Sequence, residues 1–138
     1  MSTKFESSIR QISYPQQNVY NMLSDLSNLE KVKDRVPADK IQDFSFDSDT
    51  LSVKVAPVGA ITMRIVDREE PKCIKFETSE SPMPFNFWIQ ILPVSESVCK
   101  MKLTIKSEVN PFLVSMIKKP LQEGLEKIAD MLQMINYE

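Results

Sequence analysis

The stretch NPFLVSMIKKPLQEGLEKIADML, residues 110–132, decides the fold, because it reads as one long helix. Asn110 and Pro111 form a helix start, with a capping residue before a proline at the first helical position. An apolar side chain then recurs every three or four residues, at Leu113, Ile117, Leu121, Leu125, Ile128, Leu132 and Ile135. The pattern predicts a helix from about Pro111 to Asn136, roughly 40 Å long.

Two residues inside this stretch are poor helix formers. Proline in a helix interior costs about 3 kcal/mol and glycine about 1 kcal/mol relative to alanine. The apolar stripe nevertheless continues across Pro120 and Gly124, which predicts that the helix does not end there. Gly124 has no side chain, so we expect that it either lets a strand approach closely or leaves room for a ligand.

The middle of the chain alternates apolar and polar residues with the period of a β-strand. Leu51, Val53 and Val55 alternate with Ser52 and Lys54, and four later segments repeat the pattern, around residues 61–65, 74–78, 85–91 and 99–105. A further strand is expected from residue 40 and a first strand over residues 3–14. Two short helices should lie between them, one opened by Pro15 and one by the capping box SNLE at residues 27–30, ending near residue 37.

This order predicts an α+β fold in which about seven antiparallel strands form a sheet with one apolar face. Such a face must be covered, and the C-terminal helix is the element long enough to cover it. We therefore expect a single domain over residues 1–138, with a curved sheet wrapped around that helix.

Three segments together resemble the START / Bet v 1-like (SRPBCC) superfamily, with bacterial polyketide cyclase/dehydratase-like members among its branches. They are NVYNMLSDLSNLEK in the first helix pair, GAITMRIVDREEPKCIKFE across two strands, and the terminal helix. The resemblance covers nearly the whole chain and implies the helix-grip fold. It also implies a hydrophobic cavity that binds lipids, steroids, polyketides or related apolar molecules.

Composition restricts the functional classes. The chain has 138 residues, a net charge of -2, no histidine and two glycines. Without histidine, Ser-His or Cys-His nucleophile pairs and the usual metal ligand are missing, and two glycines cannot form a phosphate-binding glycine-rich loop. We therefore predict no catalytic residues, metal or cofactor. We also predict no nucleic-acid partner, no stable membrane insertion and, from the polar N-terminus, a cytoplasmic location. The oligomeric state stays open.

The candidate ligand-binding residues are those whose strand or helix position turns them toward the space between sheet and helix. They are Val53, Val55, Met63, Ile65, Phe76, Phe85, Phe87, Ile89, Met101, Leu103, Ile117, Leu121, Gly124 and Ile128. A solid core is the alternative interpretation of the same stripes.

Three functional hypotheses follow. The first is binding of an apolar small molecule or lipid between sheet and helix, without catalysis. The second is a cyclase or dehydratase, which without histidine needs an acid or base from groups such as Arg64, Asp67, Tyr14, Tyr20 or Tyr137. The third is a partner-binding domain that works through Trp88 on the opposite face of the sheet.

The two cysteines are predicted to be free thiols. Strand parity turns Cys73 outward and Cys99 inward, with one strand between them. That arrangement is too wide and too misdirected for a disulfide bond.

Overall fold

A computed structural model describes residues 2–31, 41–55, 59–80, 84–108, 111–135 and 137. In chain order, its elements are β1 (Ser2–Glu6), β2 (Arg10–Ile12), α1 (Gln16–Leu23), the 3-10 helix η1 (Leu26–Lys31), β3 (Ile41–Phe46), β4 (Thr50–Val55), β5 (Gly59–Glu69), β6 (Cys73–Glu80), β7 (Phe85–Pro93), β8 (Cys99–Glu108) and α2 (Pro111–Gln133). None of the described helices is both long and apolar enough to cross a bilayer.

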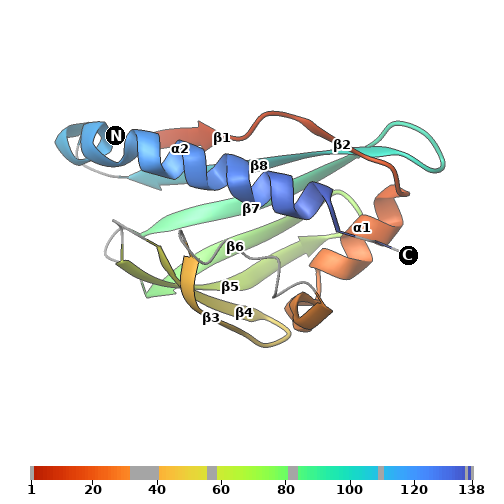
Figure 1. The fold of residues 1–138 in the computed structure, drawn as a ribbon, viewed down its shortest axis with the longest axis horizontal. Coiled ribbons are helices and arrows are strands. Elements are labelled where there is room, and N and C mark those ends of the chain that lie inside the picture. Colours follow the sequence, from red (N-terminus) through yellow and green to blue (C-terminus); the bar gives the residue numbers. More distant parts are fainter. Residues whose placement is uncertain are drawn as a thin grey trace.

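The strands form one eight-stranded antiparallel sheet in the order β1-β8-β7-β6-β5-β4-β3, with β2 also paired to β8. From β3 to β8 each strand pairs with the next along the chain, as short turns between alternating segments predict. The sheet curves around α2, and α1 lies near the C-terminal end of that helix (Figure 1). The predicted α+β helix-grip architecture is confirmed, with eight strands where about seven were expected.

The extra strand comes from the N-terminal segment, where one continuous strand over residues 3–14 was the wrong prediction. Phe5 and Ile12 are both buried, at 4% and 1% exposure, yet they are an odd number of residues apart. In a straight strand they would point to opposite faces. The chain therefore breaks into β1 and β2, with an irregular segment between Glu6 and Arg10 that leaves Ile9 64% exposed.

The two short helices differ in type and in capping. α1 is an α-helix that buries Val19, Tyr20 and Leu23, whereas the second is a 3-10 helix. The predicted capping box at Ser27 is wrong, because η1 already begins at Leu26. The carboxylate of Asp25 accepts the backbone N–H of Ser27 at 3.0 Å, which is the bond an N-cap makes. The predicted helix end near residue 37 lies outside the described residues.

The long helix α2 continues through Pro120 and Gly124, as its apolar stripe predicts, and ends at Gln133 rather than at Asn136. Its second half is anchored by Leu121, Leu125, Ala129 and Leu132, all buried. Continuity across two unfavourable residues is consistent with helix stability that comes from tertiary packing of the apolar face.

The cysteines lie where strand parity predicts. Cys73 is half-buried on β6, Cys99 is buried on β8, and β7 runs between their strands. Both thiols are free. Burial raises the pKa of each thiol, so neither has the lowered pKa of a reactive cysteine.

Candidate binding site between the sheet and the C-terminal helix

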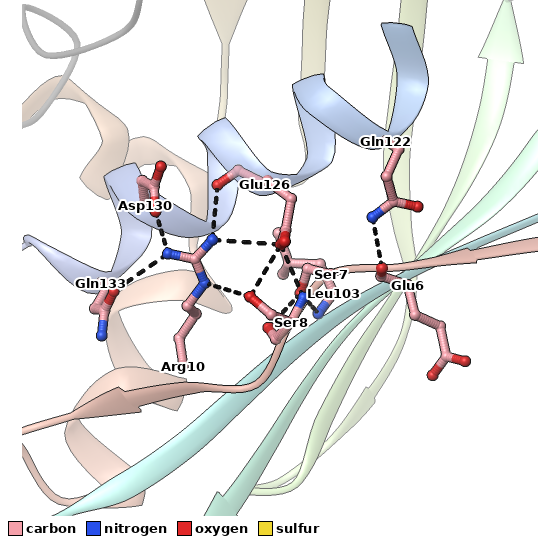
Figure 2. Close-up of polar contacts among 9 residues, drawn as sticks. All are labelled: Glu6, Ser7, Ser8, Arg10, Leu103, Gln122, Glu126, Asp130 and Gln133. Carbon is pink, nitrogen blue, oxygen red and sulfur yellow. Dashed lines mark hydrogen bonds and ion pairs between the residues drawn. The ribbon is translucent and has the colours of Figure 1, made fainter. Parts of the chain in front are cut away.

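One flank of α2 is fixed to the edge of the sheet by a row of polar side chains (Figure 2). The amide of Gln122 donates to the carbonyl of Glu6 at 2.7 Å, and the amide of Gln133 donates to the carbonyl of Gln11 at 2.8 Å. Between them, Glu126 and Asp130 both bind Arg10 of β2. The row repeats at helical spacing, so a single face of α2 lies along β1 and β2.

Glu126 is the centre of this row. One of its carboxylate oxygens accepts the backbone N–H of Ser8 at 2.8 Å, the hydroxyl of Ser8 at 3.2 Å and the Arg10 guanidinium at 3.3 Å. Partial burial by itself would raise the pKa of this carboxyl group. The bonds from Ser8 and Arg10 outweigh burial and lower the pKa below its ordinary value. The charged form of Glu126 therefore ties the segment between β1 and β2 to the helix.

Most of the inward side chains of the sheet are buried, and one row at its β3 end is half-buried. Ile74, Ile89 and Leu103 lie opposite one another on β6, β7 and β8 and are 0–4% exposed. Along another row of the sheet, Phe46 on β3, Leu51 on β4 and Met63 on β5 are opposite one another and only half-buried. The apolar wall thus extends from β8 to β3.

The opposite flank of α2 is apolar. Gly124, Ile128 and Met131 lie across the helix from the polar row, because 100° per residue places them roughly half a turn away from Glu126 and Gln133. Since the polar row faces the edge strands β1 and β2, this flank faces toward β3. Ile128 and Met131 are half-buried hydrophobic residues packed against the core. We call the six residues Phe46, Leu51, Met63, Gly124, Ile128 and Met131 the half-buried apolar set.

Gly124 has free space where its side chain would be. A Cβ atom built on its backbone meets no heavy atom of its described surroundings within 4 Å. Of the two roles expected for this glycine, close approach by a strand is not seen among the described residues, and room for a ligand stays a prediction.

The candidate residues predicted from the sequence fall into three groups. Most form the buried wall: Ile65, Phe76, Phe85, Phe87, Ile89, Met101, Leu103 and Leu121. Three are half-buried: Met63, Gly124 and Ile128. The side chains of Val53, Val55 and Ile117 lie outside the described residues.

Of the ionisable groups considered for catalysis, Tyr14 and Tyr137 lie in contact, with their ring centroids 5.8 Å apart. Arg64 and Asp67 are exposed on β5. The Tyr137 hydroxyl donates to the carbonyl of Leu132 at 2.5 Å, and burial raises its pKa. Burial, followed by the charge of Glu70, also raises the pKa of Tyr20. Within the described part of the chain, no group of three or more acidic, cysteine or histidine residues could hold a metal ion.

Trp88 lies on the other face of the sheet, half-buried, with the ammonium group of Lys75 at 5.6 Å from its ring centroid. The two residues are direct cross-strand partners on β6 and β7. This is the packed, partly exposed tryptophan that the alternation of β7 predicts.

No family model and no curated protein matches the sequence. Solved structures do match. Norcoclaurine synthase from Thalictrum flavum, a point mutant in complex with a transition state analogue, has a TM-score of 0.75 at 16% identity, over 96% of this chain and 92% of that one. A START superfamily protein from Mycobacterium smegmatis has a TM-score of 0.69 at 14% identity, over 96% and 94%. The chain has the START / Bet v 1-like helix-grip fold. The Zhui aromatase/cyclase from Streptomyces sp. R1128 shares this helix-grip fold, with a TM-score of 0.71 at 10% identity over 96% and 92%.

Sequence reasoning missed some residues of the candidate site. Phe46 and Met131 belong to the half-buried apolar set but were not among the candidates. Met131 lies beside the main apolar stripe of α2 rather than on it. Phe46 follows a register shift between Gln42 and Ser45, which disturbs the alternation that would have identified it. The polar row on α2 could have been recognised from the sequence, because Gln122, Glu126 and Asp130 follow one another at i, i+4 spacing.

Proposed function

We propose that this protein binds an apolar small molecule or lipid between the curved sheet and α2. The observation that carries the proposal is the half-buried apolar set, which continues the buried wall on both the sheet and the helix. Apolar side chains that converge from two elements and stay partly accessible are typical of small-molecule sites. The open space at Gly124 supports the same interpretation.

Methionine is prominent at this site, with Met63 on β5 and Met131 on α2. Its unbranched, flexible side chain adapts to irregular space and to ligands of variable shape. Met22 in α1 is a further half-buried methionine packed on the same core. These methionines favour a site with adaptable apolar contacts over a rigid polar pocket.

The solved structures with this fold include proteins named as a synthase and as an aromatase/cyclase. For this chain the described groups favour binding over catalysis. Acid–base chemistry needs two ionisable groups within hydrogen-bond reach of one substrate. The ionisable side chains that are buried in the described part of the chain are Tyr20, Cys99 and Tyr137. Burial raises the pKa of each, so all three stay protonated at neutral pH and none is available there as a general base.

The test is ligand capture and its loss in a filled variant. Native mass spectrometry of freshly purified protein should show a bound apolar molecule, and delipidated protein should take up an apolar fluorescent dye in saturable fashion. Gly124→Leu places a side chain into the open space and should reduce dye uptake at least tenfold while the melting temperature stays the same or rises.

Lys127→Leu is the matched control, because it introduces the same leucine side chain at an exposed position on the outer side of α2. It should leave dye uptake unchanged. A wild-type protein that carries no ligand and takes up no dye would overturn the proposed function. Equal losses in both variants would show that the dye binds elsewhere.

A further inference from the structure

We infer that Thr78 is a specificity-determining residue of the proposed site. Its hydroxyl group donates a hydrogen bond to an acceptor oxygen of the bound molecule, such as a carbonyl, and so favours ligands that carry one at this point. The inference rests on the proposed function and adds the residue that selects among apolar ligands. It comes from the place of Thr78 in the sheet and from the hydrogen bond that its side chain makes.

Thr78 lies on the inner face of the sheet, in the same row as the sheet residues of the half-buried apolar set. Phe46, Leu51 and Met63 are opposite one another on β3, β4 and β5. Thr78 on β6 is the cross-strand partner of Met63. It faces the same side as the buried Phe76 two residues earlier, and it is itself half-buried. Its hydroxyl group therefore lies where the apolar wall is still partly accessible.

The Thr78 hydroxyl is held in place by the backbone of the next strand. Its oxygen accepts the N–H of Phe85 on β7 at 3.1 Å. A side chain branched at Cβ has few χ1 rotamers, and this bond favours one of them. An O–H group that accepts a hydrogen bond is also polarised into a stronger donor. The contact with Phe85 thus positions and strengthens the O–H of Thr78 for donation.

That O–H donates to no group among the described residues. A hydroxyl group has one donor and two acceptor positions, and the bond from Phe85 uses one acceptor position of Thr78. The buried hydroxyls differ in this respect. Those of Ser7, Thr104 and Ser107 donate to oxygens of the protein at 2.9, 3.0 and 2.6 Å. At Thr78, the donor position is available to water or to a ligand.

A ligand that packs against Met63 displaces water from the neighbouring Thr78. A ligand oxygen at this point replaces the bond to water, whereas a pure hydrocarbon leaves the O–H without a partner. The net value of one neutral hydrogen bond corresponds to about a 2- to 12-fold difference in affinity. Because the rest of the row is apolar, the preference is for a single acceptor on an otherwise apolar molecule.

The experiment compares benzophenone with diphenylmethane, which have the same two rings joined by a carbonyl or by a methylene group. Each compound displaces the apolar dye from delipidated wild-type protein and from each variant. The measured quantity is the ratio of the benzophenone affinity to the diphenylmethane affinity. This ratio cancels any effect of a substitution that is common to both compounds.

Thr78→Val keeps the shape of the side chain and removes the hydroxyl, so the ratio should fall about 2- to 12-fold. Thr78→Ser keeps the hydroxyl and should keep the ratio close to that of wild type. Thermal melts confirm that each variant is folded. If Thr78→Val does not fold, Thr78→Cys takes its place, and the ratio should fall there too because a thiol is a weak donor.

Thr104→Val is the matched control. It makes the same substitution at another hydrogen-bonded threonine, but on the opposite face of the sheet, where Thr104 is the cross-strand partner of Trp88. The ratio should stay at the wild-type value. An equal fall in Thr104→Val and Thr78→Val would contradict the inference, because the effect would not belong to the inner face.

The outcomes separate the inference from the proposed function. If the dye binds and the ratio is the same in Thr78→Val and wild type, the inference is wrong and apolar-ligand binding stands. If diphenylmethane displaces the dye but benzophenone does not, the inference is again wrong. If neither the dye nor either compound binds, both proposals are wrong.

Discussion

Ser7 and Leu103 exchange two hydrogen bonds across the irregular segment between β1 and β2. The backbone N–H of Ser7 donates to the carbonyl of Leu103 at 2.9 Å, and the Ser7 hydroxyl oxygen accepts the backbone N–H of Leu103 at 2.9 Å. A side chain thus takes the place of the missing backbone acceptor where the strand is irregular. This pair lets Phe5 and Ile12 both reach the core while the ladder to β8 stays satisfied.

The first prediction tests whether the Ser7 hydroxyl replaces a backbone acceptor for the N–H of Leu103. Ser7→Ala leaves the buried N–H of Leu103 without an acceptor, which should lower the free energy of unfolding by about 1–3 kcal/mol. For a chain of this size the melting temperature should fall by about 3–10 °C. Ser13→Ala, at an exposed bend, is the control and should change little. Equal melting temperatures for Ser7→Ala and wild type would show that another group satisfies Leu103.

The second prediction concerns the pH dependence of the α2 attachment. The pKa of Glu126 is lowered in the folded protein, so its charged form stabilises the fold above the ordinary carboxyl pKa, and this contribution disappears as pH falls through the folded value. Glu126→Gln should therefore be less stable than wild type at pH 7, by about 0.5–1.5 kcal/mol, and the difference should shrink toward pH 3. Urea unfolding at both values measures it.

Glu123→Gln is the matched control for Glu126→Gln, because Glu123 is exposed on the outer side of the same helix. Its stability relative to wild type should depend little on pH. If the deficit of Glu126→Gln stays constant from pH 7 to pH 3, the charge of Glu126 is not what holds the segment of Ser8 and Arg10 to α2.

The sequence predicts the strands and the terminal helix well, because both depend on local periodicity. Alternation along β4 to β8 identifies which side chains turn inward, and the burial of Ile74, Phe87 and Leu103 confirms it. The stripe on α2 likewise identifies Leu121 and Leu125. These patterns occur because one face of each element is buried in the folded protein.

The N-terminal segment and the border of the site could not be predicted in the same way. The break between β1 and β2 depends on the pairing with β8, about a hundred residues later, through Ser7 and Leu103. The space beside Gly124 depends on which residues of other elements approach the helix there, which no local pattern specifies.

The third prediction uses the free space at Gly124. Alanine there meets no atom of the described surroundings within 4 Å, and it is the better helix former. Gly124→Ala should therefore raise the free energy of unfolding by about 0.5–1 kcal/mol, seen as a melting temperature higher by about 2–3 °C. A lower melting temperature would show that the backbone at this position needs glycine.

The last prediction concerns Tyr137, which is 2% exposed and stacks edge-on against Tyr14 at a centroid distance of 5.8 Å. Burial raises its pKa, with a smaller contribution from Cys99. A raised folded pKa means that the folded state holds its proton more tightly than the unfolded state does. The stability that this group contributes is therefore complete below the ordinary tyrosine pKa of about 10 and is lost as pH rises above it.

Tyr137→Phe should separate the contribution of the Tyr137 hydrogen bond from the effect of its ionisation on stability. At pH 8 the variant loses the hydrogen bond to the Leu132 carbonyl and should be less stable by about 0.5–1.5 kcal/mol. Between pH 9 and pH 11 wild type should lose stability more steeply than the variant, because phenylalanine has no proton to release. Urea unfolding of both proteins across this range measures the two slopes. Parallel slopes would show that Tyr137 ionises in the folded protein as easily as in the unfolded chain, so that burial among α2, Tyr14 and Cys99 does not hold its proton.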